Sequence, residues 1–183
     1  MVADVPVERL VFVDETGRHT RMTPLDARAP RGERASDHVP RHPTRTTTLI
    51  AALTREGLDA SMVREGAMDR AAFVVWLTHV LLPTLAPGHV VVMDNLSVHK
   101  GGQVRQIIEG VACELVSLPA YSPDFTLIEG TYSKVKTHLR RAAKRTQEER
   151  VTAIGTAVEA VTSSDAHGWF TPCGYSPTAA QRT

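Results

Sequence analysis

Two short apolar runs in this chain each end in an aspartate. Leu10–Val13 is followed by Asp14, and Val90–Met93 is followed by Asp94. An uninterrupted apolar run of this length, closed by an acidic residue, is typical of a buried β-strand. The two matching runs therefore predict two strands whose last positions carry a carboxylate.

The rest of the chain alternates between strand and helix signals. β-branched and apolar stretches predict strands at residues 46–54, 58–65 and 113–119, with a weaker one at 18–24. Helical spacing predicts helices at residues 69–85, 103–110, about 126–143 and 148–161, and a short helical piece in the tail. Residues 25–45 lack periodicity and are expected to form a long loop. This order predicts an α/β fold with a mixed central sheet flanked by helices, in one domain of 183 residues.

Asp14 and Asp94 are the first candidate site residues. Ligand sites of open α/β sheets lie outside the carboxyl ends of the strands, where both aspartates are expected. On neighbouring strands their carboxylates would converge on one hard cation, and Mg²⁺ suits such a site. The alternative is that each aspartate only ends its strand as a turn or cap residue. Glu15 competes with Asp14, but strand alternation directs the two side chains to opposite faces, and Asp14 matches Asp94 in position.

Glu129 is the third carboxylate candidate. Together with Thr126 it fits the S/T-x-x-E capping box, in which Glu129 would only satisfy the amide of Thr126. A side chain in the first turn of a helix can also face the strand ends, and the positive end of the helix dipole favours a carboxylate there. The local sequence leaves both interpretations open.

Two basic clusters are candidates for binding nucleic acid, and they matter because the formal net charge is only +1. Seven arginines and three acids lie between residues 18 and 45. The second cluster has no acid between residues 130 and 147, and it consists of Lys134, Lys136, Arg140, Arg141, Lys144 and Arg145. For each cluster a solvated face is the alternative to phosphate binding.

Cysteine content and hydropathy indicate the cellular environment in which the protein is expected. The chain has only Cys113 and Cys173, far apart and without zinc-site spacing, so a reduced, cytoplasmic environment is expected. No apolar run reaches the ~18 residues of a membrane span, and the N-terminus lacks the architecture of a secretion signal. No membrane partner is expected.

Three blocks of the sequence resemble a known family. "VFVDETG", "VVMDNLSVHK" and "LPAYSPDFTLIEGTYSKVKTHLRR" occur in this order, with 34 residues between Asp94 and Glu129. Together they resemble the DDE transposases of the mariner-like bacterial insertion-sequence superfamily. The resemblance implies a ribonuclease-H-like fold and assigns catalysis and metal binding to Asp14, Asp94 and Glu129.

The same resemblance implies the chemistry and the partners. The expected activity is metal-dependent DNA strand cleavage and strand transfer at insertion-element ends, with two Mg²⁺ ions that Mn²⁺ can replace. Double-stranded DNA, as element end and as target, would be bound by the second basic cluster and by His99 and Lys100 at the edge of the site. A capping or packing histidine is the alternative for His99. The protein would be cytoplasmic and associated with the nucleoid when bound to DNA.

The chain departs from the family pattern in two ways. It has Thr126-Leu127 where the family has Asn-Pro, which retains a cap and loses a rigid helix start. The first catalytic strand begins about nine residues from Met1. Residues 1–183 are therefore expected to form a catalytic domain without the N-terminal helix-turn-helix region, as an isolated domain, a fragment or one part of a split reading frame. A separate N-terminal DNA-binding part is an optional partner. A homodimer is a further option.

Two other functions remain open at this point. One is a catalytically inactive transposase relic that acts at most as a DNA-binding or assembly module, which the departures favour and the three acids oppose. The other is a ribonuclease-H-type or repair nuclease, which shares the metal chemistry but fits the third block less well.

Overall fold

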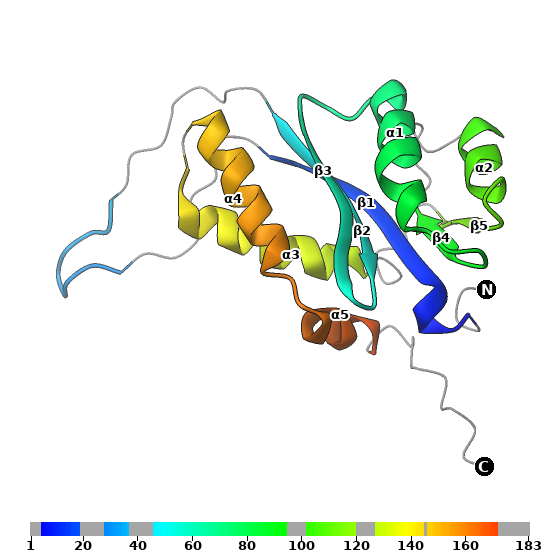
Figure 1. The fold of residues 1–183 in the computed structure, drawn as a ribbon. Helices are drawn as coiled ribbons and strands as arrows, with labels where there is room; N and C mark the ends of the chain where they lie inside the picture. The colour runs from blue at the N-terminus through cyan, green and yellow to red at the C-terminus, as the bar shows by residue number, and fades with distance from the viewer. Residues whose placement is uncertain are drawn as a thin grey trace, which may run out of the picture.

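The structure is a computed structural model, and it describes residues 5–18, 28–36, 46–94, 102–119, 127–144 and 146–171. Its centre is a five-stranded sheet with the order β3-β2-β1-β4-β5 (Figure 1). The strands are β1 (Leu10–Arg18), β2 (Thr47–Thr54), β3 (Gly57–Glu65), β4 (Val90–Met93) and β5 (Glu114–Ser117). β1 is antiparallel to β2 and β2 to β3, whereas β1, β4 and β5 are parallel. The predicted mixed sheet is confirmed.

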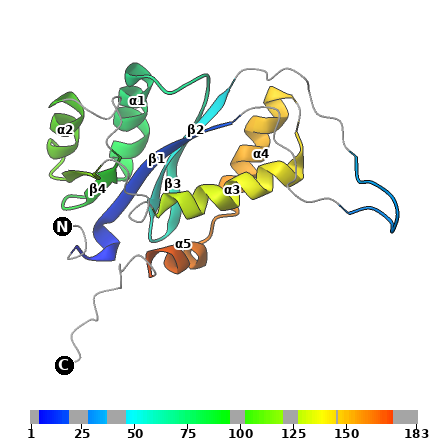
Figure 2. The ribbon, with the colours of Figure 1, turned by 180° about the vertical axis from the view of Figure 1, so that it is seen from behind.

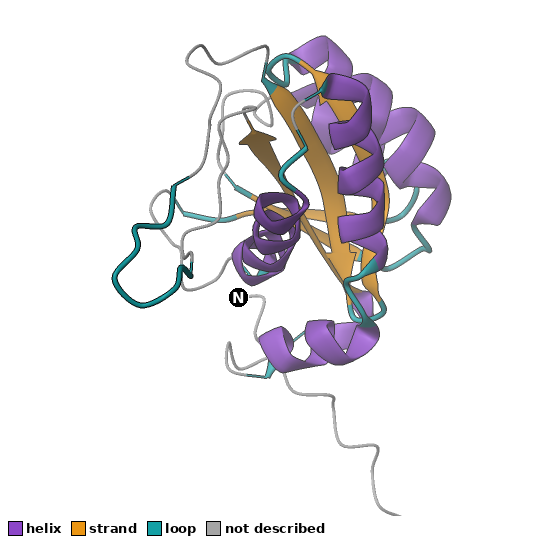
Figure 3. Cartoon of the chain, turned by 90° about the vertical axis from the view of Figure 1, so that its left-hand side faces the viewer, coloured by secondary structure: helices purple, strands orange, loops and turns teal. Residues whose placement is uncertain are grey.

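Helices cover both faces of the sheet, as Figures 2 and 3 show. One face carries α1 (Arg70–Trp76), its continuations η3 (Leu77–Leu81) and η4 (Leu82–Thr84), and α2 (Gly102–Glu109). The other carries α3 (Ile128–Ala142), α4 (Gln147–Glu159) and α5 (Ser163–Phe170), and a short turn, η2 (Val7–Arg9), precedes β1. None of the described helices combines the length and the apolar character that a membrane crossing needs.

The first strand is longer than its apolar run predicts. The run ends at Val13, whereas β1 continues to Arg18. The extension follows from pairing, because β2 accompanies β1 as far as the pair Arg18 and Thr47. β4 pairs with β1 only up to Val13. The partner strand therefore sets this end, and the hydrophobic pattern alone did not show it.

The helix predicted at residues 69–85 changes its hydrogen bonding along its length. It is α-helical to Trp76, π-helical over Leu77–Leu81 and 3₁₀-helical over Leu82–Thr84. Pro83 explains the change, since it has no amide hydrogen to donate and its ring crowds the carbonyl four residues earlier. Phe73 and Trp76 of this helix are completely buried in the core.

The long loop is only partly described. Residues 28–36 have no regular secondary structure and are exposed, as predicted. The rest of the predicted loop, and the weak strand predicted at 18–24 apart from Arg18, lie outside the described residues.

Helix α5 packs tightly against the first half of α3. Lys134 Nζ of α3 lies 2.5 Å from Asp165 Oδ2 of α5. Gly130 of α3 faces the indole of Trp169, and a Cβ at position 130 would lie 3.0 Å from ring atoms of that indole. Phe170 packs edge-on against Phe12 of β1, with ring centroids 5.7 Å apart. The helix that carries Glu129 is thus in contact with both α5 and the sheet.

Gly130→Ala tests this close contact, with Gly155→Ala on α4 as the matched control. In a helix, alanine is favoured over glycine by about 1 kcal/mol. Nothing lies within 4 Å of a Cβ at Gly155, so we expect that substitution to raise the free energy of unfolding by roughly 0.5–1 kcal/mol. At Gly130 the collision with Trp169 should reverse the sign and lower it by about 1 kcal/mol. Urea unfolding measures both, and equal stabilisation by the two substitutions would contradict the packing.

Asp165→Asn tests the ion pair between α3 and α5. Lys134, together with the hydroxyl and amide of Thr162, lowers the pKa of Asp165 to about 2. A depressed carboxylate pKa contributes stability above the unfolded-state pKa of about 3.9, and this stability is lost as the pH falls toward 2. We expect the variant to be less stable by about 1 kcal/mol at pH 7, because it weakens a partly exposed pair and a helix cap.

The pH dependence separates this effect from a general packing defect. The stability difference between wild type and Asp165→Asn should shrink as the pH is lowered from about 5 toward 2. A difference that stays constant over that range in denaturant unfolding would show that the charge on Asp165 contributes nothing.

Candidate active site

The parallel register of β1 and β4 ends at the pair Val13 and Met93. Asp14 and Asp94 are the next residues along these two neighbouring strands. Neighbouring strands lie about 4.8 Å apart, so the two aspartates occupy adjacent places where β4 ends. Asp94 directly follows its strand, as predicted, whereas Asp14 lies inside β1, which continues to Arg18, so the prediction that Asp14 ends its strand is wrong.

The core residues on each side of β1 show on which face of the sheet the Asp14 side chain lies. Leu10 and Phe12 belong to the core beneath α3, α4 and α5, whereas Val11 and Val13 belong to the core beneath α1 and α2. Side chains alternate along a strand, so Asp14 continues the series on the α3 face. It is half-buried there.

Strand β4 repeats this arrangement. Val90 and Val92 contribute to the core on the α3 face, and Val91 and Met93 to the opposite core. Asp94, also half-buried, continues the series of Val90 and Val92. Both aspartates thus follow residues that face the same helix, whereas Glu15 follows the series of the opposite face.

Tyr132 connects helix α3 to Asp14 in β1. Its hydroxyl donates a hydrogen bond to the backbone carbonyl of Asp14, and its side chain is only 2% exposed. Burial, followed by the carboxylates of Asp14 and Glu15, raises the pKa of Tyr132 well above its usual value. The hydroxyl therefore stays protonated and able to donate at neutral pH.

Glu129 lies one helical turn before Tyr132 and is exposed. It is in the first turn of α3, whose N-cap position is taken by Leu127 without a side-chain hydrogen bond. Thr126, the other member of the predicted capping box, lies outside the described residues. The first turn of α3 is thus placed beside Asp14 of β1 through Tyr132.

The two flanks of α3 face different surroundings. Gly130 and Lys134 contact α5. Together with His138, which faces α4, they lie on one flank, because successive residues turn by about 100°. Glu129 lies on the other flank. α4 and α5 contact β3, whereas α3 contacts β1. Since β4 is on the opposite side of β1 from β3, the flank with Glu129 faces the side of β4 and Asp94.

The donor chemistry of these residues suits a divalent metal. Asp14, Asp94 and Glu129 offer only carboxylate oxygens, which are the ligands of Mg²⁺ and Mn²⁺. In the part of the chain that the structure describes, no group of three or more His, Cys, Asp or Glu side chains is arranged to hold a metal ion. The exposed Glu129 side chain has to turn toward the aspartates for the three to act together.

The predicted DNA-binding residues have different environments. Lys134 is paired with Asp165, and Lys144 lies 3.4 Å from Glu149. Lys136 and Arg140 share the flank of α3 with Glu129 and form no ion pair among the described residues. Arg141 is exposed and on the flank of Lys134. Arg145, His99 and Lys100 lie outside the described residues.

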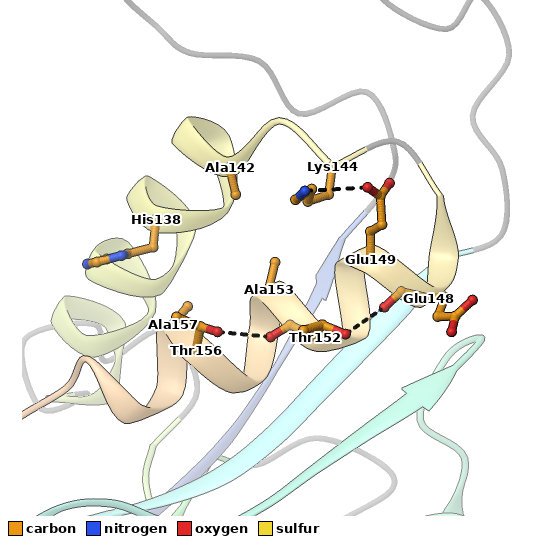
Figure 4. A pocket seen from close by; sticks show the side chains of 9 residues that line it. All are labelled: His138, Ala142, Lys144, Glu148, Glu149, Thr152, Ala153, Thr156 and Ala157. Carbon is orange, nitrogen blue, oxygen red and sulfur yellow. Dashed lines mark hydrogen bonds and ion pairs between the residues drawn. The ribbon is translucent and has the colours of Figure 1, made fainter.

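A groove of about 450 Å³ between α3 and α4 is separate from the carboxylates (Figure 4). Its lining includes His138, Ala142, Lys144, Glu149 and Ala157. His138 and Ala142 belong to the flank of α3 that faces away from Glu129. The groove therefore does not form part of the candidate active site.

Sequence reasoning missed the part that Tyr132 plays at the site. Its ring is buried in the core. Its polar tip was the available signal, because a buried tyrosine hydroxyl usually has a hydrogen-bond partner. Because Tyr132 lies three residues after Glu129, the hydrogen-bond partner of its hydroxyl is expected next to the site.

Comparison with solved structures identifies the fold. The chain superimposes on the Mos1 transposase paired-end complex with left transposon end with a TM-score of 0.73 and 16% identity, covering 92% of this chain and 53% of that one. The crystal structure of the catalytic domain of Mos1 mariner transposase gives a TM-score of 0.62 and 15% identity, covering 92% and 78%. A chain of the simian T-cell lymphotropic virus intasome in complex with PP2A regulatory subunit B56 gamma gives 0.56 and 13%, covering 84% and 47%.

These matches confirm the ribonuclease-H-like fold that the sequence led us to expect. The chain spans about half the length of the full Mos1 chains. No curated protein sequence is similar enough to count as a relative. The model of the DDE superfamily endonuclease family matches residues 9–152, a range that includes Asp14, Asp94 and Glu129. The chain therefore belongs to the DDE superfamily of endonucleases.

Proposed function

We propose that this chain is the catalytic domain of a transposase, which cleaves DNA strands at the ends of an insertion element and joins them to a target. The observation that carries the proposal is that Asp14 and Asp94 directly follow the last in-register pair of β1 and β4, with Asp14 hydrogen-bonded to Tyr132 of α3. The matched solved structures include Mos1 complexes with transposon-end DNA, and one described as a strand transfer complex.

Asp14, Asp94 and Glu129 are the proposed metal ligands and catalytic residues. Asp14 lies within β1 and is paired with Ala51 of β2, Asp94 directly follows the last residue of β4, and Glu129 belongs to a helix outside the sheet. Two bound Mg²⁺ ions, or Mn²⁺ in their place, would activate the attacking oxygen and stabilise the leaving one. Structures of the Mos1 catalytic domain with Mg and with Mn are among the matches.

The flank of α3 next to Glu129 is the proposed path of the DNA backbone. Lys136 and Arg140 lie there about 10 and 16 Å beyond Glu129 along the helix axis, at 1.5 Å per residue. Contacts to phosphates position DNA and carry no base information. Arg141, Lys144, Arg145, His99 and Lys100 remain proposed contacts. The ion pair of Lys134 with α5 makes it the weakest candidate, since that pair must break first.

The proposed partners follow from this activity. They are double-stranded DNA, as element ends and as target, a second copy of the chain, and a separate N-terminal DNA-binding part. Residues 1–183 then act as one catalytic domain. The proposed location is the cytoplasm, in association with the nucleoid.

A nicking assay on insertion-element-end DNA tests the proposal. Wild-type protein should nick the DNA with Mg²⁺ or Mn²⁺ and remain inactive with EDTA. Asp14→Asn, Asp94→Asn and Glu129→Gln should each lower the rate by about 100-fold or more, because a metal site supplies several kcal/mol of transition-state stabilisation. Glu15→Gln is the matched control, since its series faces the opposite side of the sheet, and it should retain activity.

The possible outcomes separate the competing functions. Folded wild-type protein that binds DNA and nicks none of it in either metal would point to an inactive relic. Cleavage of RNA–DNA hybrids without preference for element ends would point to a ribonuclease-H-type nuclease. Activity that survives Glu129→Gln would remove this residue from the catalytic set.

Salt-dependent DNA binding tests the proposed backbone path. Each phosphate contact contributes about −0.9 to the slope of log affinity against log salt on duplex DNA. Lys136→Ala/Arg140→Ala should reduce the magnitude of that slope by up to about two and weaken all duplexes alike. The control double variant is Arg55→Ala/Arg105→Ala, which removes the same charge from two residues that are ion-paired elsewhere on the surface. Equal slopes for the two double variants would show that this flank does not contact DNA.

A further inference from the structure

Tyr132 is the described residue that links the proposed catalytic elements directly. It belongs to α3, which carries Glu129, and its hydroxyl donates a hydrogen bond to the backbone carbonyl of Asp14 in β1. The two residues are 118 positions apart in the chain, so this contact joins two elements that are distant in sequence. Its ring lies in the core together with Phe12, Val92 and Ile128.

The neighbouring residue Thr131 shows that such a hydrogen bond is not a general feature of this helix. Thr131 is as deeply buried as Tyr132, yet its hydroxyl has no hydrogen-bond partner in the part of the chain that the structure describes. A buried hydroxyl without a partner costs stability, whereas the Tyr132 hydroxyl is satisfied at one defined carbonyl. The two hydroxyls, adjacent in sequence, therefore provide a natural comparison.

The geometry limits how α3 can move relative to β1. Apolar packing holds α3 against the sheet but is non-directional and permits small slides and rotations. A hydrogen bond requires a donor–acceptor distance near 2.7 Å and a narrow range of angles, so it selects one register of the helix. Because Glu129 lies one turn before Tyr132, that register also sets where the Glu129 backbone stands relative to Asp14.

We propose that Tyr132 is a positioning residue, whose hydroxyl holds the helix of Glu129 in register with Asp14 so that the three carboxylates can share a metal ion. This inference rests on the proposed function. Tyr132 contacts neither the metal nor DNA in this role, and it acts through the backbone of Asp14.

Mn²⁺ binding by the full chain, measured by calorimetry, tests this inference without relying on turnover. Tyr132→Phe keeps the buried ring and removes only the hydroxyl. We expect it to weaken Mn²⁺ affinity by about three- to tenfold, the range that the net contribution of one hydrogen bond corresponds to. Thr131→Val is the matched control, since it removes an unpartnered buried hydroxyl from the adjacent position, and it should leave Mn²⁺ affinity unchanged.

The outcomes distinguish this inference from the proposed function. Wild-type protein that does not bind Mn²⁺ overturns both. Wild-type binding with equal affinity in Tyr132→Phe overturns the positioning role alone, even if the variant is less stable, because a merely structural hydrogen bond would lower the melting temperature and leave metal affinity intact.

Hydrogen–deuterium exchange provides a second measurement that does not depend on the folding of Tyr132→Phe. In a Glu129→Gln chain, saturating Mn²⁺ no longer has the Glu129 carboxylate as a ligand on α3. Increased amide protection at residues 132–138 on adding Mn²⁺ would support coupling through Tyr132. Protection confined to β1 and β4 would overturn it.

Discussion

The candidate site depends first on the parallel pairing of β1 with β4. This pairing sets Leu10–Val13 against Val90–Met93 residue by residue, and it places both aspartates at the same edge. A slip of one residue would turn every side chain of one strand to the other face. The apolar residues on both faces of these strands prevent such a slip, since their side chains are nearly fully buried. Burial of ordinary valine and leucine side chains thus determines the alignment of the two carboxylates.

The third carboxylate depends on a different kind of contact. Glu129 is carried by α3 and not by a strand, so no strand register places it. Tyr132 contacts the backbone of Asp14 in β1, and Trp169 packs on Gly130 one residue after Glu129. α5 lies beyond residues 9–152, the range that the family model matches. Holding α3 in place therefore involves a segment outside that range.

The electrostatic layout follows from the same packing. One flank of α3 contacts α4 and α5, and a basic residue there, Lys134, is neutralised by Asp165. The other flank carries Glu129, Lys136 and Arg140, without an ion pair to Lys136 or Arg140 among the described residues. A helix with basic residues all along its length is thereby divided into a structural flank and a flank available to phosphates. The net charge of the chain would not reveal this division.

Most elements of the fold could be predicted from sequence, because the apolar runs and helical spacings are long enough to show their period. The end of β1 could not, since β2 sets it through cross-strand pairing. Asp14 and Asp94 were recognisable because each closes an apolar run. Glu129 was locally ambiguous, and only its combination with two other sequence blocks favoured a catalytic role. Lys134 pairs with Asp165, 31 residues away, and Tyr132 with Asp14, 118 residues away. A local sequence pattern cannot predict contacts over such separations.

The central claim is that Asp14, Asp94 and Glu129 form one metal site. Anomalous diffraction from crystals soaked in Mn²⁺ tests it most directly. We expect a manganese peak beside Asp14 of β1 and the carboxyl end of β4, with oxygens of both aspartates and of Glu129 about 2.0–2.3 Å from the bound metal. A peak at another place in the molecule, or one beside the two aspartates with Glu129 still turned to solvent, would contradict the claim.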